Sequence, residues 1–135
     1  MKINKRILVR WVKVIIIVYC AIGIALYYLQ EKLLFHPQKL ESNYVFHFDQ
    51  RFEEMKLPVN QEDTISLVKF YPDSVKPRGL VLYYHGNMNN IEQYAPLVAP
   101  FVKHGYEVWM ADYPGFGKTT GTRTEKKMYD QARII

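Results

Sequence analysis

The longest apolar stretch of the sequence covers residues 14–30, and it contains no charged residue. A helix rises about 1.5 Å per residue, so these 17 positions span roughly 25 Å. That length is just enough to cross the hydrocarbon core of a bilayer when Arg10 and Lys13 extend their charged ends outward. Trp11 and Tyr27 lie near the two ends, where aromatic side chains favour the membrane interface. The pattern predicts a membrane-spanning helix.

A cleaved signal peptide is the competing interpretation, because the preceding segment is basic and the apolar run is short. However, no A-x-A-like cleavage site follows, and the chain continues through the bulky residues 26–29. A lipoprotein site at Cys20 is disfavoured by Tyr19, which stands where a small residue is needed. We therefore expect an uncleaved signal anchor with a cytoplasmic N-terminus. The chain from about residue 31 onward is then extracytoplasmic, on the periplasmic face of the inner membrane in a Gram-negative cell.

Three short runs rich in aromatic and β-branched residues follow, at 44–48, 52–57 and 64–71. Polar residues separate them, which is the pattern of antiparallel strands. Residues 72–79 are a loop by composition. Residues 80–84 then form a continuous apolar run, which is typical of a parallel strand buried on both faces.

This apolar run ends at His85-Gly86-Asn87, where the glycine permits a sharp turn. Residues 91–104 have the pattern of a helix that Pro100 kinks or interrupts. Residues 106–111 return as a second buried strand, and residues 112–117 close a loop at the same sheet edge. The helix is expected to face the sheet with Leu97, Val98, Phe101 and Val102. Strand, helix and strand in this order predict an α/β fold, in which ligands bind at the carboxyl ends of the strands.

The last residues predict one more helix. Thr122 and Glu125 have the spacing of a capping box, which marks a helix start. The apolar positions that follow form a stripe made of Met128, Tyr129, Ala132 and Ile135.

Charge and cysteine content narrow the possible functions. The 135 residues carry a formal net charge of +5, and five basic residues precede the apolar stretch. The rest of the chain holds 13 basic and 13 acidic residues, so the charge describes a membrane flank and gives no support to nucleic-acid binding. Cys20 is the only cysteine, which excludes an intrachain disulfide and a multi-thiolate metal site.

Two motifs together resemble a known superfamily. HGN after an apolar strand, followed about 25 residues later by DYPGFGKTTG, looks like the N-terminal half of an α/β-hydrolase. YYLQEKLL followed by FHP looks like the entry to membrane-anchored bacterial members. The resemblance covers nearly the whole chain. It implies an α/β-hydrolase sheet that opens with antiparallel strands and continues with a parallel βαβ unit, preceded by one transmembrane helix.

The resemblance divides the chain into four parts. Residues 1–13 are a basic cytoplasmic flank, 14–30 the signal anchor and 31–43 a juxtamembrane linker. Residues 44–135 are then a partial hydrolase domain that stops before the nucleophile elbow. The parent implied by the resemblance is a serine hydrolase of carboxylic or thio esters, whose partners are the membrane and a small-molecule or lipid-like acyl ester.

The resemblance assigns roles to the two loops. The backbone N–H of Asn87 is implied as half of the oxyanion hole. His85 and Gly86 support that loop, and we expect His85 to bind the neighbouring loop rather than act as a general base. Asp112, with Gly115 and Gly117, is expected to hold the 112–117 turn through hydrogen bonds from loop N–H groups. Lys118 and the charges at 123–127 are expected to form a solvated face.

The catalytic residues themselves are absent from the sequence. Ser42, Ser66 and Ser74 are its only serines, and none lies in a G-x-S-x-G pattern. The histidines outside the HGN turn, His36, His47 and His104, have no metal-ligand spacing, so neither a metal nor a cofactor is expected. We therefore expect the 135 residues alone to be catalytically inactive.

Two other functions stay open at this point. Gly117-Lys118-Thr119 resembles the end of a phosphate-binding loop, but Asp112 stands where that motif needs glycine. A non-catalytic, membrane-tethered interaction module is the other alternative. For the truncated hydrolase, the apolar strand at 80–84 lacks a second neighbour, so residues 36–135 are expected to aggregate without the anchor. A soluble, cooperatively folding monomer would favour the interaction module.

Overall fold

The computed structural model describes residues 4–74 and 76–135. The chain divides into two units, Met1–Leu34 and Phe35–Ile135. Within the first unit, α1 is a continuous helix over Lys5–Leu34, and none of its residues is buried. It covers the predicted span 14–30 and extends beyond it at both ends. Its length and apolar composition suit a membrane-spanning helix, and a signal sequence would meet the same criteria.

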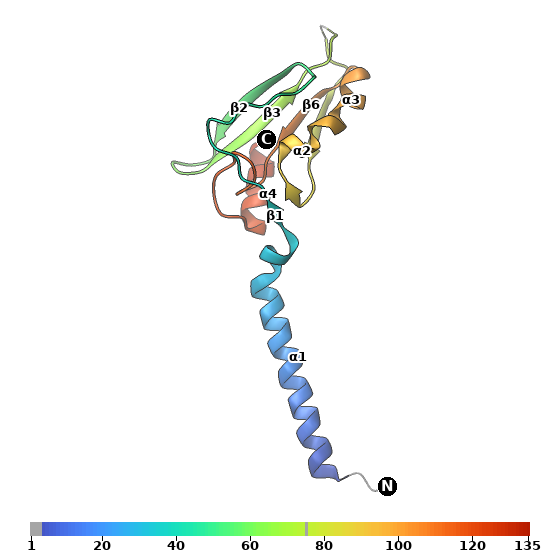
Figure 1. The fold of residues 1–135 in the computed structure, drawn as a ribbon, viewed down its shortest axis with the longest axis vertical. Coiled ribbons are helices and arrows are strands. Elements are labelled where there is room, and N and C mark those ends of the chain that lie inside the picture. The colour runs from blue at the N-terminus through green and yellow to red at the C-terminus, as the bar shows by residue number, and fades with distance from the viewer. Residues whose placement is uncertain (1–3, 75) are drawn as a thin grey trace. The chain divides into compact units, whose positions relative to one another are not determined.

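The second unit is built on a mixed four-stranded sheet (Figure 1). Its strands are β2 (Phe52–Pro58), β3 (Thr64–Phe70), β4 (Leu80–Tyr84) and β6 (Glu107–Ala111), in the order β2-β3-β6-β4. β2 and β3 form an antiparallel hairpin, β6 pairs antiparallel to β3, and β4 pairs parallel to β6. The antiparallel opening and the parallel βαβ unit predicted from the sequence are therefore both present.

A second, very small sheet lies beside the first. β1 (His36–Pro37) pairs in parallel with β5 (Met88–Asn89). The sequence predicts a linker over residues 31–43, and within that range Phe35 and β1 belong to the second unit. Sequence pattern does not detect so short a strand, because two residues have no measurable periodicity.

The crossover between β4 and β6 is broken into three short helical pieces. They are α2 (Ile91–Tyr94), the 3₁₀ turn η1 (Ala95–Val98) and α3 (Ala99–Lys103). Pro96 and Pro100 each stand in the first turn of a piece, where a missing N–H costs no helical hydrogen bond. The interruption predicted at Pro100 is confirmed.

Two of the four crossover residues that were predicted to face the sheet do so. Val98 is fully buried and Val102 packs on the core, as expected. Leu97 and Phe101 are instead 53% and 38% exposed. Ile91 and Ala95 take their places, since the buried positions follow one another at helical spacing along the three pieces.

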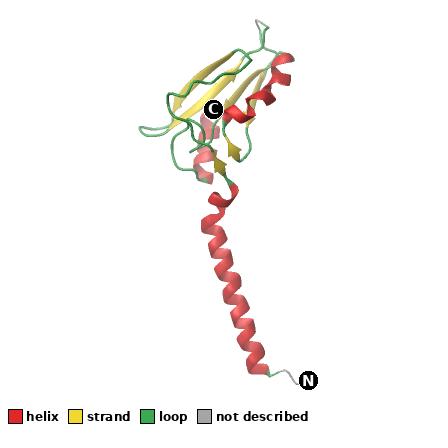
Figure 2. Cartoon of the chain, in the orientation of Figure 1, coloured by secondary structure: helices red, strands yellow, loops and turns green. Residues whose placement is uncertain are grey.

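The core lies on both faces of the sheet. Figures 1 and 2 show the crossover helices and α4 (Glu125–Ile134) on opposite sides of it. On one face the crossover packs on Val68, Phe70, Val108 and Met110. On the opposite face Ile65, Leu67 and Ala111 form a smaller cluster with Ile135 at the end of the chain. The alternation of these positions along β3 and β6 follows from the two-residue period of a strand.

Two predictions about the strands were wrong. Residues 44–48 form no strand, although Tyr44, Phe46 and Phe48 pack their rings on the first face of the core. β4 is not buried on both faces, because Leu80, Leu82 and Tyr84 are 43–49% exposed. β4 is an edge strand of the sheet, and these three side chains are only partly covered, Tyr84 by the ring of Tyr113.

The last helix, α4 (Glu125–Ile134), begins later than predicted. Its N-cap is Thr124, whose hydroxyl accepts the N–H of Lys127, and Thr122 lies outside the helix. The inward positions are Gln131, which is buried, and Ile135. Tyr129 is 63% exposed, so the predicted apolar stripe is only partly the buried face.

Candidate functional site

The candidate site lies at the carboxyl ends of β4 and β6. Because these strands are parallel and Tyr84 pairs with Ala111, the residues that follow them start side by side. His85 and Asp112 are those residues. Nε2 of His85 lies 3.2 Å from Oδ1 of Asp112, and both side chains are fully inaccessible to solvent. The HGN turn and the 112–117 loop are thus joined at their first residues.

The second ring nitrogen of His85 holds the turn itself. Nδ1 lies 2.7 Å from the carbonyl oxygen of Gly86 and donates to it. The Gly86 carbonyl and the Asn87 N–H belong to one planar peptide unit. His85 therefore fixes the plane of the peptide that carries the Asn87 N–H.

Aromatic rings enclose the imidazole of His85. The ring of Tyr94 stacks on it at 5.1 Å, and the rings of Tyr113 and Phe116 contact it at 4.6 and 5.4 Å. The hydroxyl of Tyr113 also donates to the carbonyl oxygen of His85 at 2.8 Å. Burial raises the pKa of Tyr113 to about 12, so this hydroxyl keeps its proton. These three rings restrict the orientation of the imidazole.

Asp112 connects the site to the crossover. Its Oδ1 accepts the N–H of Ile91 at 2.9 Å, at the start of α2. We expected N–H groups of its own loop as partners, and this expectation was wrong. Burial raises the pKa of Asp112, while His85, the Ile91 N–H and Lys118 act in the opposite direction.

Nε2 of His85 has no well-aligned hydrogen bond within the described residues, so its approach to Asp112 Oδ1 is a close polar contact between two buried side chains. This buried pair is a structural link between two loops.

Gly117 closes the space above the Asp112 carboxylate. A Cβ at this position would lie 1.9 Å from Asp112 Oδ2, and the backbone has φ +47. Both facts require glycine. Gly115 also adopts a positive φ, of +78, in the turn before it.

The Asn87 backbone is held from a third direction. Its carbonyl oxygen accepts the N–H of His36 at 2.8 Å, across the β1–β5 pair. Asn90, which is not among the site residues predicted from the sequence, is also part of this arrangement. Its Oδ1 caps α2 through the Glu92 N–H, and its Nδ2 donates to the carbonyl of Gln38. The signal for it was a helix-capping residue directly before Ile91.

Some of the charged side chains that were expected to form a solvated face contact other parts of the protein. Lys118 is 3% exposed at its side chain, binds Glu54 at 2.8 Å and lies 4.4 Å from the centre of the Phe46 ring. Lys127 binds Asp63 at 2.8 Å, and the guanidinium of Arg123 lies over the rings of Phe35 and Phe116. Sequence pattern missed these contacts because each partner is remote in the chain.

These contacts also disfavour phosphate binding at 117–119. Lys118 is paired with a carboxylate, and Thr119 is 4% exposed with its hydroxyl accepting the N–H of Ser66. Ser66 is itself buried in β3, whereas Ser42 and Ser74 lie in exposed loops. Within residues 4–74 and 76–135, no three His, Cys, Asp or Glu side chains group as metal ligands.

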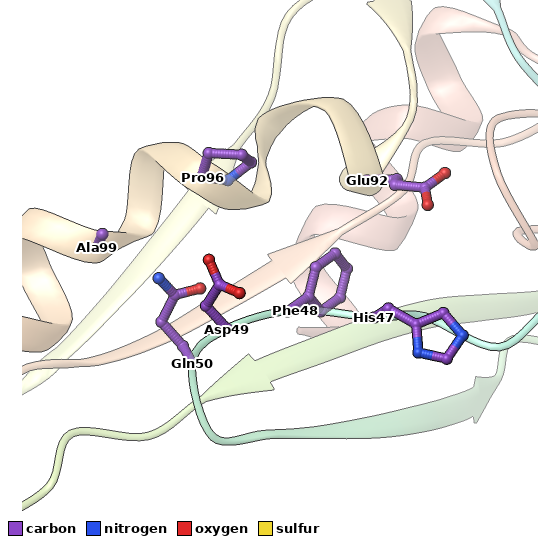
Figure 3. A pocket seen from close by; sticks show the side chains of 7 residues that line it. All are labelled: His47, Phe48, Asp49, Gln50, Glu92, Pro96 and Ala99. Atoms are coloured by element: carbon purple, nitrogen blue, oxygen red, sulfur yellow. The ribbon is translucent and has the colours of Figure 1, made fainter.

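A pocket of about 290 Å³ lies elsewhere, between residues 47–50 and the crossover (Figure 3). Figure 3 shows Asp49 and Gln50 on one side of it and Pro96 and Ala99 on the other. None of the residues that join the two loops lines this pocket. Position at the strand ends, not cavity size, therefore identifies the candidate site.

Comparison with known proteins agrees with this assignment of the fold. A family model described as serine aminopeptidase, S33 matches residues 75–133. The uncharacterized protein YfhR of Escherichia coli K12 is 32% identical over 68 residues, which cover 47% of this chain and 24% of YfhR.

Two solved structures share the fold at low identity. A carboxyl esterase from Bacillus coagulans aligns with a TM-score of 0.51 and 22% identity, over 62% of this chain and 30% of that one. A thioesterase domain from the curacin biosynthetic pathway aligns with a TM-score of 0.52 and 20% identity, over 62% of this chain and 32% of that one. The matches span about a quarter to a third of these relatives, and the resemblance to the α/β-hydrolase superfamily is confirmed.

Proposed function

We propose that this chain, which carries part of an α/β-hydrolase fold, supplies the oxyanion loop of a membrane-anchored serine hydrolase. One observation carries the proposal. The Gly86–Asn87 peptide stands at the carboxyl end of β4, and the buried His85 ring holds its plane. A peptide that is fixed in this way is suited to stabilise charge without reorganising during the reaction.

The chemistry assigned to this peptide is the following. When a nucleophile attacks the carbonyl carbon of an ester, the carbonyl oxygen becomes an oxyanion. The Asn87 N–H donates a hydrogen bond to that oxygen, and one such donor contributes about 2.7–4 kcal/mol to transition-state stabilisation. His85 and Asp112 take no part in proton transfer in this scheme. They position the peptide.

The remaining catalytic groups are assigned to residues outside these 135. No G-x-S-x-G pattern occurs in the sequence. We assign the nucleophile, its acid and base, and the second oxyanion donor to a further segment that pairs beside β4. The exposed edge of β4 supports this assignment.

The substrate class proposed is a carboxylic or thio ester, either a small molecule or a lipid-like acyl ester. The names of the two structural relatives, an esterase and a thioesterase, support it. We further propose that α1 anchors the protein in the membrane, with the basic N-terminus in the cytoplasm and the second unit outside. A periplasm-active phosphatase reporter fused after Ile135 should then be active. An inactive reporter would contradict this topology.

The test of the function uses the product of the complete gene, in detergent. It should hydrolyse a short-chain p-nitrophenyl ester or an acyl thioester, and a fluorophosphonate probe should label it and stop hydrolysis. The 135-residue chain should do neither. A complete product that is neither labelled nor active would overturn the proposal and favour the interaction module.

A further inference from the structure

The segment that follows α1 makes backbone contacts with both loops of the candidate site. Only Phe35 separates the last residue of α1, Leu34, from β1. On one side the His36 N–H donates to the Asn87 carbonyl at 2.8 Å, and the Gln38 N–H donates to the Asn89 carbonyl at 3.0 Å. The oxyanion loop is therefore paired with this segment along three of its residues.

The other edge of the same segment contacts the 112–117 loop. The Gly117 N–H donates to the Gln38 carbonyl at 2.9 Å, and the Leu40 N–H donates to the Gly117 carbonyl at 2.9 Å. Lys39 and Gly117 form the corresponding β-bridge. Gly117 is the residue that covers the Asp112 carboxylate, so this edge reaches the buried pair as well.

Gln38 is the point where the two loops meet. Its carbonyl oxygen accepts both the Gly117 N–H and the Nδ2 of Asn90, which lies 3.2 Å away. Its N–H is bound to Asn89 of the oxyanion loop. All of these contacts use the backbone of Gln38, and its own side chain is exposed.

Apolar contacts fix the two ends of the segment. The ring of Phe35 packs edge-on against Phe116 at 6.3 Å, and Leu40 packs on the core beside Phe46. Between them, the chain from His36 to Leu40 is extended and runs between the two loops. A segment held at both ends has little freedom to follow an independent movement of either loop.

We propose that residues 36–40 are a strap that sets the spacing of the two site loops, and that Gln38 is a positioning residue for the Asn87 N–H. This inference rests on the proposed function, since it assigns the strap to the oxyanion loop.

The test compares two substitutions at one position. Gln38→Pro removes the N–H that binds Asn89, whereas Gln38→Ala keeps every backbone contact and is the matched control. Hydrogen exchange is measured on the full chain in detergent micelles. In Gln38→Pro, residues 86–90 and 115–119 should exchange roughly fivefold faster or more, while residues 65–70 of β3 stay protected. Gln38→Ala should match the wild type.

The second readout is kinetic and uses an ester-hydrolysing form of the protein. Gln38→Pro should lower kcat about tenfold with little change in KM, because a misplaced donor acts on the transition state. The strap proposal would be overturned if Gln38→Pro left exchange in the two loops unchanged or accelerated exchange in β3 equally. Faster loop exchange in Gln38→Ala would overturn it too. Looser loops with an unchanged kcat would overturn the positioning role. Looser loops in a protein that hydrolyses no ester would leave the strap standing and remove the proposed function.

Discussion

The Nε2 atom of His85 lies 3.2 Å from Oδ1 of Asp112, and neither side chain is accessible to solvent. Each residue follows directly on one of two paired parallel strands, so the contact is a consequence of strand register. It ties the start of the HGN turn to the start of the 112–117 loop. Charged or polar groups buried in this way are costly unless both partners are present.

Removing one partner of this pair should therefore destabilise the fold. His85→Ala leaves the buried Asp112 carboxyl group without the side chain that contacts its Oδ1, and deletes the ring that holds Gly86. The expected loss in the free energy of unfolding is about 3–5 kcal/mol, measured by denaturant unfolding in detergent. Asp130→Ala is the control, because its pair with Lys126 is exposed and should matter by less than about 1 kcal/mol. Equal effects of the two variants would contradict the structural role of the buried pair.

The pH dependence of stability should differ between the wild type and Asp112→Asn. Burial raises the pKa of Asp112 in the folded chain above its ordinary value of 3.8, with His85 and Lys118 acting against the shift. The folded state then binds a proton more readily than the unfolded state. The stabilising contribution of Asp112 is therefore complete below the unfolded pKa and is lost as the pH rises through the folded pKa. Relative to Asp112→Asn, the wild type should be most stable at the acidic end. Unfolding midpoints over a pH series measure this, and a wild type that gains stability relative to Asp112→Asn as the pH rises would contradict it.

Gly117→Ala should be strongly destabilising. The added Cβ would stand 1.9 Å from Asp112 Oδ2, and φ is +47, where an alanine is strained. We expect a loss of at least about 2 kcal/mol, from the backbone strain together with the displaced carboxylate. Gly79→Ala is the matched control, since its Cβ would meet only the Tyr106 ring at 3.5 Å. A Gly117→Ala protein as stable as Gly79→Ala would show that the loop adapts.

The oxyanion role of Asn87 predicts a contrast between two substitutions in an ester-hydrolysing form of the protein. Asn87→Ala keeps the backbone N–H and should leave hydrolysis largely intact. Asn87→Pro removes the donor, and kcat should fall by about 10²–10³. Steady-state kinetics measure both. If Asn87→Pro stays folded and retains full activity, the assignment of this N–H is wrong.

The edge of β4 predicts self-association of the second unit. Leu80, Leu82 and Tyr84 are exposed beside an edge that has no further strand in the described chain. Residues 35–135 expressed without α1 should aggregate, and Leu82→Lys should reduce this by placing a charge on the edge strand. Leu97→Lys is the control, because Leu97 is 53% exposed on the crossover. Light scattering distinguishes the variants, and a soluble wild-type monomer with a sharp thermal transition would refute the prediction.

The sequence by itself determined the local elements of this protein. The uncharged run at 14–30 lies within one helix, and the apolar run at 80–84 is a strand with the predicted bounds. The break at Pro100 is present too. These features depend on backbone preferences and on periodic burial, which neighbouring residues specify together.

Only the tertiary structure decided which groups meet. His85 and Asp112 are 27 positions apart, and Gln38 lies farther still from the Gly117 N–H that it binds. Lys118 resembled a surface charge, yet it is buried against Glu54 and Phe46. Such contacts follow from the register of parallel strands and from the path of a short extended segment. Neither leaves a pattern in the sequence, because every non-proline residue has the same backbone donor and acceptor, whatever its side chain.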